Sequence, residues 1–597
     1  MSMKLNFKVF FRTYLREFRS DWLRYLSLFV GMNLLLTLVI IPVFNWLVGL
    51  VMSWSGIPFI SYNNLGNLLT QHLPGMLGLF VLLIVLLAVI FVQFAIQFHG
   101  VRLIQQGVGR FRMIVGESLR SLRRLSLQAF LFFIFYFLLI LPFGRIVFST
   151  PLLSKVKIPV FTMGFFMANW RNMLILGAFY LITFMIGSRF IFVLPGMILK
   201  GKTLKQALKD SLDLTHLRRF VYFVAYFALI GVLTMILSEG GKFLIYLLQL
   251  LLDMTPLAFA GSIVLLTAGE IWGMLISALA AMLFFSFLIR ELGFPLEKSP
   301  RTPTRSTFRI ASSIFGALAI LLLGLSSWFY LSGGMDHKVL AISHRGVDND
   351  NGVQNTLPAL ELTAREKPDY VEMDIQETAD HQFVVFHDAS LKELTGVNKT
   401  AQEMTLSELT KLTVTEKGKS APLVSFDDYF ASAEKLGQKL LIEIKTSPRD
   451  SSDILNIFVQ KYGARILKNK DMVHSLDYGV ITGLKKLEPA IPVSFILPLN
   501  LAFPQTDANA YTEEETTLDS DFVIQAHNHK QQVYAWTIND TKMMQRQIVY
   551  GVDGIITDKL SDLQKTIKDS EGKNISYAER LLVLFSLEPN PGDNAVN

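Results

Sequence analysis

The sequence predicts an α-helical membrane bundle of about seven spans, followed by an α/β (β/α)8 TIM-barrel domain with a small inserted subdomain. Of 597 residues, 51% are hydrophobic and only 18% are charged, which is too apolar for a soluble chain. Apolar runs of about 20 residues, the length that crosses a bilayer as a helix, recur up to Leu331. After Val339, short apolar runs alternate with helix-like segments, as in a parallel barrel.

Each predicted span is an apolar run bounded by polar residues. No small-residue cleavage site follows a short apolar core near the start, so we expect a retained anchor rather than a signal peptide. The apolar run Phe243–Leu252 is too short to span and is interpreted as an interfacial or re-entrant segment. The predicted spans are Leu26–Met52, Met76–Phe98, Leu127–Phe148, Asn172–Leu194, Phe220–Leu237, Gly261–Ile289 and Ile310–Leu331.

The net charge of +7 comes from basic residues in alternate loops between the spans. The basic loops are Arg102–Arg124, Lys200–Arg219 and Arg290–Arg309, together with the segment before the first span. Basic loops stay in the cytoplasm, which predicts a plasma-membrane protein with a cytoplasmic N-terminus and an extracellular domain after Leu331. The charge therefore indicates topology and membrane lipids as partners, and no nucleic acid. The first two loops are either interfacial helices or ordinary loops.

Two charged residues, Arg189 and Glu270, lie inside predicted spans. An ionised group there costs at least about 2.5 kcal/mol and needs a partner or water. We interpret them as an ion pair that holds the bundle together, or as part of a path for a polar lipid headgroup.

The predicted barrel strands are short apolar runs bounded by turn residues. The segment Ala389–Lys435 is too long for a simple connection and predicts an inserted subdomain. The expected domains are residues 1–332, 339–567 with the insertion at about 389–435, and a C-terminal tail at 568–597. The predicted strands are Val339–Ser343, Tyr370–Asp374, Phe383–Phe386, Leu440–Ile444, Met472–Ser475, Pro492–Ile496, Val533–Thr537 and Gly554–Thr557.

Charged residues gather where the first predicted strands end. Glu372 and Asp374 are two apart on one strand, so both carboxylates face one side, as a Ca²⁺ or Mg²⁺ site requires. His344 and His387 can divide the roles of proton acceptor and donor. Arg345 offers a planar guanidinium suited to phosphate. Together these residue types indicate phosphodiester hydrolysis.

Six motifs occur in order between about Val339 and Leu563, and this pattern resembles the glycerophosphodiester phosphodiesterase family. Several spans followed by such a domain resemble the membrane-anchored branch of the family in bacteria of Gram-positive type. The motifs are H-R-G at His344, N-T at Asn355, E-x-D at Glu372, H-D at His387, I-E-I-K at Ile442 and A-W-T-I-N-D at Ala535.

The resemblance implies a metal held by Glu372, Asp374 and Glu443. An all-carboxylate set favours Ca²⁺ or Mg²⁺, and the absence of cysteine excludes thiolate ligands and disulfides. The resemblance to the family also implies that His344 and His387 are the acid and base. The nucleophile is either the substrate's own glycerol 2-hydroxyl or water, and the sequence leaves open which histidine acts as which.

Further residues have implied positions around the phosphate and the glycerol. Arg345 and Lys445 would neutralise the phosphoryl oxygens. Trp536 would form the wall of the glycerol pocket, or would be a buried barrel tryptophan, and Asn355 would orient a neighbouring group. The chain departs from the common E-N-T motif at Gln354, which puts the loop over the metal in doubt. No role is predicted for His474, His527 or His529.

The predicted function is hydrolysis of glycerophosphodiesters at the outer membrane face, giving glycerol 3-phosphate and an alcohol. The expected substrates are lysolipid headgroups or the polyglycerophosphate of lipoteichoic acid. One alternative is lysophospholipase D-type cleavage, which leaves lysophosphatidate. Another is a non-catalytic transporter or sensor that binds a lipid or polymer, although the complete motif set argues against an idle barrel.

Overall fold

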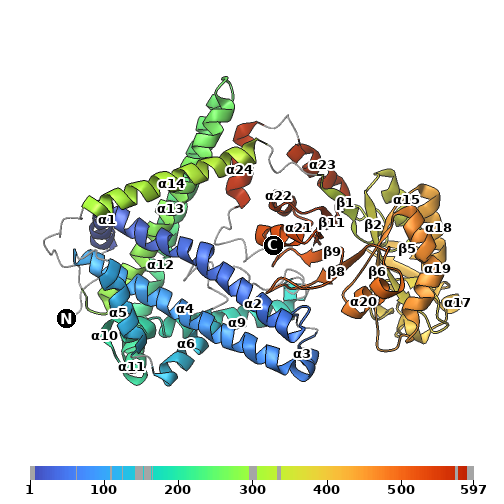
Figure 1. Cartoon of the computed structure of the whole chain (residues 1–597), viewed down its shortest axis with the longest axis horizontal. Coiled ribbons are helices and arrows are strands. Elements are labelled where there is room, and N and C mark those ends of the chain that lie inside the picture. Colours follow the sequence, from blue (N-terminus) through green and yellow to red (C-terminus); the bar gives the residue numbers. More distant parts are fainter. Residues whose placement is uncertain are drawn as a thin grey trace.

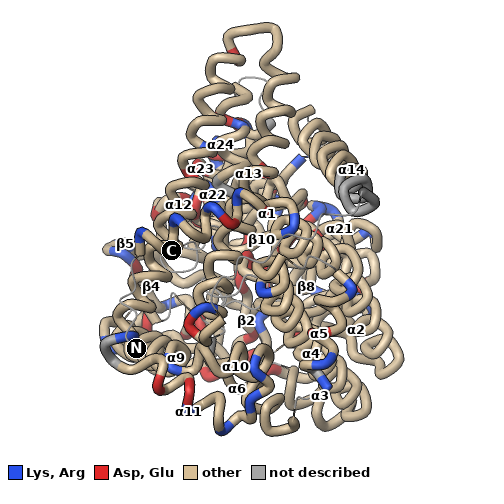
Figure 2. The backbone as a smooth tube through the Cα atoms, turned by 90° about the vertical axis from the view of Figure 1, so that its left-hand side faces the viewer, with Lys and Arg blue, Asp and Glu red and all other residues tan. Residues whose placement is uncertain are grey.

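The computed structural model describes residues 7–61, 64–107, 111–123, 126–140, 152, 163, 166–167, 169–294, 306–332, 338–571 and 576–587. A helical bundle formed by the N-terminal half lies beside an α/β barrel formed by the C-terminal half (Figure 1). Figure 2 shows long stretches without charged residues along the helices of the bundle.

Five segments of the described chain are long and apolar enough to cross a membrane: Phe7–Ser55, Leu73–Gln105, Trp170–Lys200, Arg219–Leu252 and Ala258–Glu291. Two apolar helices, Leu127–Leu139 and Gly316–Leu331, are shorter. The helices of the bundle are α1 (Phe7–Leu35), the π-helical turn Leu36–Ile40, α2 (Ile41–Ser55), α3 (Leu65–Gln71), α4 (Leu73–Gln105), α5 (Phe111–Arg123), α6 (Leu127–Ile140), α9 (Trp170–Arg189), α10 (Val193–Lys200), α11 (Leu204–Leu214), α12 (Leu217–Leu252), α13 (Ala258–Glu291) and α14 (Ser306–Leu331).

All seven predicted spans lie in helical segments of the structure. Five of these segments are long enough to cross a membrane, and the described helices of the third and seventh predicted spans are shorter. The predicted end of the third span lies outside the described residues, as do the connector 295–305 and the linker 333–337. The basic segments after α4 and α10 contain the helices α5 and α11. Arg189 donates from its guanidinium to the backbone carbonyl of Thr215, and its pairing with Glu270 stays a prediction.

The prediction of a separate interfacial or re-entrant segment at Phe243–Leu252 is wrong. These residues are the end of α12, which is one continuous helix of 36 residues. α12 contains two successive glycines, Gly240 and Gly241, which often end a helix. Close packing against α13 explains why the helix continues through them. The indole Nε1 of Trp272 donates to the carbonyl of Leu237 at 2.9 Å. A Cβ added to Gly241 would lie 2.2 Å from that indole nitrogen, so only glycine permits this approach.

The C-terminal half contains a closed barrel of eight parallel strands, as the sequence predicts. β1 pairs with β2 on one side and with β11 on the other, which closes the barrel. The strands are β1 (Leu340–Ser343), β2 (Tyr370–Glu377), β6 (Leu440–Ile444), β7 (Met472–Ser475), β8 (Val493–Leu497), β9 (Ala510–Glu514), β10 (Gln532–Trp536) and β11 (Gly554–Thr557). The surrounding helices are α15 (Leu357–Arg365), α18 (Phe426–Leu436), α19 (Ile454–Asn469), α20 (Tyr478–Leu487), α21 (Ser520–Asn528), α22 (Thr541–Tyr550) and α23 (Leu560–Glu571).

Two strands differ from the prediction. β3 (Phe383–Val385) pairs antiparallel with β2 and is not a barrel strand. β9 was not predicted, because its sequence A-Y-T-E-E ends in charged residues. Both glutamates are nevertheless buried and accept hydrogen bonds from the following turn, Glu513 from Thr517 and Glu514 from Thr516.

The segment between β3 and α18 forms a small unit of its own at the barrel edge. It comprises α16 (Lys392–Thr395), a 3₁₀ turn (Ala401–Glu403), α17 (Leu406–Leu409) and the hairpin of β4 (Thr413–Glu416) and β5 (Lys419–Pro422). A separate apolar cluster, which includes Phe386, Leu391 and Leu409, holds this unit together.

The bundle contacts the barrel through the loop between α2 and α3. Phe59 in this loop is 7% exposed, and its ring lies 4.7 Å from that of Phe495 and 5.5 Å from that of Tyr478. Gln505 donates from its backbone to the carbonyl of Pro58 at 2.7 Å and from its side chain to that of Gly49 at 2.9 Å. Phe59 therefore belongs to the main apolar core of the barrel.

A second contact is made by the C-terminal helix α24 (Tyr577–Leu587), which packs on the bundle near α12, α13 and α14 (Figure 1). Leu581 and Phe585 share an apolar cluster with Ile245, Leu266 and Leu331 of the bundle. The barrel is thus attached to the bundle at both the α2–α3 loop and the C-terminal helix.

We predict that Phe59→Ala lowers the free energy of unfolding by about 3 kcal/mol, because it empties a buried aromatic site. Thermal unfolding of the full chain in detergent, followed by near-ultraviolet circular dichroism, measures the change. Phe80→Ala is the matched control, because Phe80 is 57% exposed on α4. Equal melting temperatures for the two variants would contradict the contact described for Phe59.

Candidate active site

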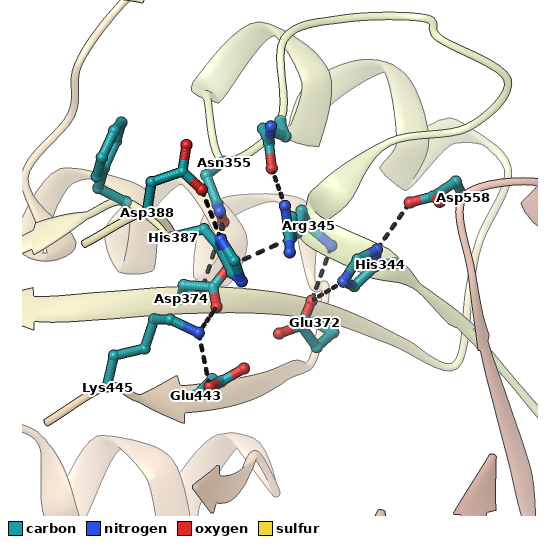
Figure 3. Close-up of polar contacts among 12 residues, drawn as sticks. His344, Arg345, Asn355, Glu372, Asp374, His387, Asp388, Glu443, Lys445 and Asp558 are labelled. Atoms are coloured by element: carbon teal, nitrogen blue, oxygen red, sulfur yellow. Dashed lines mark hydrogen bonds and ion pairs between the residues drawn. The ribbon is translucent and has the colours of Figure 1, made fainter. Parts of the chain in front are cut away.

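The predicted site residues converge at the C-terminal end of the barrel strands (Figure 3). His344 and Arg345 directly follow β1, Glu372 and Asp374 lie on β2, and His387 follows β3. Glu443 lies on β6, and Lys445 directly follows that strand. The structure therefore brings together all the residues predicted to act as acid, base, phosphate ligand or metal ligand.

His344 is oriented by the carboxylate of Asp558, which directly follows the last barrel strand, β11. Its Nδ1 lies 2.7 Å from Oδ1 of Asp558, whose other oxygen accepts from Asn539 Nδ2 at 2.7 Å. Burial would raise the pKa of Asp558, but the hydrogen bond and charge of His344, with Asn539 and Arg345, lower it to about 2. The ionised Asp558 holds the proton of His344 on Nδ1, which leaves Nε2 for the reaction.

His387 has an equivalent arrangement. Its Nδ1 lies 2.8 Å from Oδ1 of the neighbouring Asp388, and this hydrogen bond is the main cause that lowers the pKa of Asp388. Gln376 fixes the loop by donating to the carbonyls of Phe386 and Asp388, both at 2.9 Å. Both predicted catalytic histidines thus have a carboxylate at Nδ1, and Nε2 of His344 lies 3.9 Å from Oε2 of Glu372.

Asp374 is a buried carboxylate surrounded by donors. Asn355 Nδ2 donates to its Oδ2 at 2.8 Å, while Lys445 Nζ and Arg345 Nε lie 3.4 Å and 3.7 Å from its oxygens. Burial opposes ionisation of Asp374, but the positive charges of Lys445, His387 and Arg345 hold its pKa well below the usual range. Asn355 therefore lies where it can orient Asp374, and its role as an orienting residue stays a prediction.

Lys445 joins two carboxylates, because its Nζ also donates to Oε1 of Glu443 at 2.8 Å. Burial is the main cause that raises the pKa of Glu443, and the negative charge of Asp374 adds to it, although Lys445 opposes both. Burial would lower the pKa of Lys445, but the two carboxylates raise it. The lysine is therefore a fixed cation next to the carboxylates.

One group of described side chains has the spacing of a metal site. Ligand atoms of Glu372, Glu443 and His474 lie within 4.8 Å of one another, and all three residues are buried. His474 Nε2 lies 3.4 Å from Glu372 Oε1. Two carboxylates and an imidazole fit a divalent cation. Asp374 is outside this group, so its predicted role as a ligand stays a prediction, and the sequence assigned no role to His474.

Family comparison agrees with this geometry in both halves of the chain. A model of the glycerophosphoryl diester phosphodiesterase family matches residues 344–561, and a model of the membrane domain of glycerophosphoryl diester phosphodiesterase matches residues 11–326. The chain belongs to the glycerophosphodiester phosphodiesterase family. The bundle thus corresponds to the membrane domain that the one model describes, and the barrel to the region that the family model matches.

Individual relatives match the barrel half. A glycerophosphodiester phosphodiesterase from Caldanaerobacter subterraneus is 25% identical over 230 residues, 37% of this chain and 94% of the relative. A human lysophospholipase D is 40% identical over 106 residues, 17% of this chain and 33% of the relative. The structure of an Oleispira antarctica phosphodiesterase in complex with sn-glycerol-3-phosphate has 21% identity, covers 39% of this chain and 97% of its own, and gives a TM-score of 0.34.

In this chain, the glutamine at position 354, where the family commonly has glutamate, has a structural reason. Its side-chain oxygen accepts from the guanidinium of Arg345, and its Nε2 donates to Glu416 Oε1 at 3.1 Å. An amide can accept from one partner and donate to the other, whereas a glutamate would repel Glu416. Gln354 therefore links Arg345 to the hairpin of β4 and β5.

The backbone around Arg345 is fixed as well. Arg345 has a φ of 51°, and its N–H donates to Oε2 of Glu372 at 2.9 Å. The predicted pocket residue Trp536 ends β10 at the same end of the barrel, where it is half-buried and donates from Nε1 to the carbonyl of Thr512 at 3.1 Å. Its contact with glycerol stays a prediction.

Besides His474, three residues of the site were not identified from the sequence as functional: Asp388, Asn539 and Asp558. Asp388 and Asn539 lie inside quoted motifs, so their position was a usable signal. Asp558 follows the predicted strand Gly554–Thr557, and a polar residue at a strand end of a barrel is the only local signal that could have indicated it.

We predict that Asp558→Asn lowers kcat by roughly 10²-fold, because His344 loses the carboxylate that fixes its tautomer. Steady-state hydrolysis of a glycerophosphodiester by the full chain measures the change, and KM should change little. Asp553→Asn is a matched control, because Asp553 pairs with the surface His527 at 2.9 Å. A similar loss in both variants would show that the effect is structural and not specific to His344.

Proposed function

We propose that this protein hydrolyses glycerophosphodiesters at the outer face of the plasma membrane, releasing glycerol 3-phosphate and an alcohol. The observation that carries the proposal is the pair of histidines at one barrel end. His344 and His387 each have Nδ1 bonded to a carboxylate, and the cations Arg345 and Lys445 lie beside them. Phosphodiester cleavage needs this combination of two proton-transfer groups and fixed positive charge.

The chemistry divides between the two imidazoles. Nε2 of one histidine takes a proton from the nucleophile, which is either the 2-hydroxyl of the substrate's glycerol or water. Nε2 of the other histidine gives a proton to the leaving alkoxide as the bond from phosphorus to that oxygen breaks. Attack by water gives glycerol 3-phosphate directly. Attack by the 2-hydroxyl gives a cyclic phosphate, and water then breaks the new bond from phosphorus to the 2-oxygen, with the two histidines exchanging their roles. Arg345 and Lys445 neutralise the negative charge on the phosphoryl oxygens, and Trp536 lines the glycerol pocket.

A divalent cation, Ca²⁺ or Mg²⁺, would be held by Glu372, Asp374 and Glu443. When bound, such an ion neutralises the charge that builds on the phosphoryl oxygens. The buried carboxylates support a cation at this place, because three of them lie close together and the described residues set two fixed cations, Lys445 and Arg345, against them.

Membrane-linked substrates are supported by the position of the bundle. Tyr478 and Gln505, which contact the α2–α3 loop, follow the C-terminal ends of β7 and β8, at the same barrel end as the site. The distribution of basic loops supports an extracellular position for this end. Lysolipid headgroups and the polyglycerophosphate of lipoteichoic acid are therefore the substrates we propose.

Lysophospholipase D-type cleavage is a second candidate, supported by the local 40% identity to the human lysophospholipase D. This reaction would break the bond between phosphorus and the headgroup oxygen of a lysolipid. The phosphate would then stay on the acylglycerol, and the product would be lysophosphatidate. Product identification separates the two reactions.

We predict that the purified full-length protein releases glycerol 3-phosphate from glycerophosphocholine, lysophosphatidylglycerol or polyglycerophosphate, and that a chelator stops the release. His387→Ala should lower turnover by at least roughly 10²-fold, because one of the two proton transfers is lost. Mass spectrometry of the products measures both effects. His381→Ala is the matched control, since His381 is an exposed histidine of the β2–β3 turn.

Each result distinguishes one part of the proposal. Turnover of glycerophosphocholine alone would contradict the membrane-linked substrates. Lysophosphatidate as the product would favour the second candidate. Absence of turnover with all three substrates would contradict the hydrolase function and favour a binding role for the barrel.

A further inference from the structure

His474 on β7 is a buried histidine that the proposed hydrolysis does not use. Its side chain is 3% exposed, and neither ring nitrogen has a hydrogen-bond partner among the described residues. A buried imidazole without a hydrogen bond is unfavourable, because its nitrogens lose water and here gain only the contact of Nε2 with Glu372 Oε1 at 3.4 Å. The residue therefore indicates a missing partner at this position.

The strand register places His474 within the carboxylate group. Asp374 on β2 is opposite Glu443 on β6, and Glu443 is opposite His474 on β7. Side chains that are opposite on neighbouring strands project to the same face of the sheet. Met472, two residues earlier on the same face, belongs to the apolar cluster of Ile342 and Leu441 that fills the barrel interior. His474 therefore faces the interior, next to Glu443.

The distances around His474 are those of a potential ligand. Its Nε2 lies 3.4 Å from Glu372 Oε1, and one ligand atom from each of Glu372, Glu443 and His474 lies within 4.8 Å of the others. Two carboxylates alone do not make a metal site. The buried imidazole directed at them, which makes no hydrogen bond among the described residues, is the second observation, and it supplies a nitrogen donor.

The charge of the site favours a neutral side chain, such as an imidazole, as the additional metal ligand. Glu372, Asp374 and Glu443 carry three negative charges, and Arg345 and Lys445 carry two positive ones. A fourth carboxylate would repel the phosphate of the substrate, whereas an imidazole adds a metal donor without adding negative charge.

We propose that His474 is a direct ligand, with Glu372 and Glu443, of the divalent cation in this site. The inference rests on the proposed metal-dependent function and specifies the metal. Imidazole nitrogen binds Co²⁺ and Zn²⁺ well and Mn²⁺ more weakly, whereas Ca²⁺ and Mg²⁺ prefer oxygen. With His474 as a ligand, the site favours a transition-metal ion, which revises the Ca²⁺ or Mg²⁺ proposed above for a purely carboxylate set.

The test is pulsed electron paramagnetic resonance of the full-length protein loaded with Mn²⁺ in detergent. A histidine nitrogen bound to Mn²⁺ gives a ¹⁴N modulation of the spin echo, and this readout does not depend on activity. We expect the modulation in the wild type and its loss in His474→Asn. The matched control is His527→Asn, whose histidine pairs with Asp553 on the surface and should leave the modulation unchanged.

Titration calorimetry with Mn²⁺ and Ca²⁺ adds a second measurement. His474→Asn should weaken Mn²⁺ binding by roughly 10- to 100-fold and Ca²⁺ binding much less, so the preference between the ions changes. If the variant does not fold, wild type grown with ¹⁵N-histidine replaces it, because a bound histidine then exchanges the ¹⁴N modulation for a ¹⁵N signal.

Absence of a nitrogen signal in the wild type, or its persistence in His474→Asn, would overturn the assignment. Either result together with chelator-sensitive turnover would leave the proposed hydrolysis standing. Conversely, a nitrogen signal that depends on His474, together with chelator-insensitive turnover, would support the ligand and contradict a metal-dependent reaction.

Discussion

The burial of three carboxylates at one end of the barrel is the constraint on which the site depends. The parallel register of β2 and β6 places Asp374 opposite Glu443, and Glu372 lies two residues before Asp374 on the same face. Charges this close repel each other and lose hydration, so the site is stable only with compensating cations. Lys445, two residues after Glu443, reaches both Glu443 and Asp374, and Arg345 reaches Asp374 from the end of β1. The two-residue spacings of E-x-D and E-x-K follow from this requirement.

The barrel could be predicted from the sequence because most of its strands are apolar on both faces. Strands such as Leu440–Ile444 and Met472–Ser475 have the predicted bounds. β9 could not be recognised, since its buried glutamates depend on hydrogen bonds from the next turn rather than on apolar side chains. Local pattern also could not show that β3 pairs antiparallel, because pairing partners are a property of the closed sheet. In the bundle, the continuity of α12 depends on Trp272 of the neighbouring helix.

In the site, too, residues in short local motifs could be predicted, whereas residues that come together only through strand pairing could not. Residues within short motifs, such as His344 and Glu372, were identified because their spacing along the chain carries the chemistry. Asp558 was missed because it is 214 positions from His344 and reaches it only when β1 pairs with β11. His474 was missed because a single histidine in M-V-H-S has no distinctive neighbours, and only the register of β6 with β7 shows that it faces the carboxylates.

The insertion of Phe59 into the barrel core has a consequence for how the enzyme responds to its membrane. Helices whose apolar length differs from the bilayer thickness adjust by tilting. Because Phe59 lies only a few residues after α2 and is held by Phe495 and Tyr478, a tilt of α2 is transmitted to the barrel as a rigid movement. The bundle and the barrel are then expected to tilt together, because a separate tilt of α2 would withdraw Phe59 from the core and expose its ring to water.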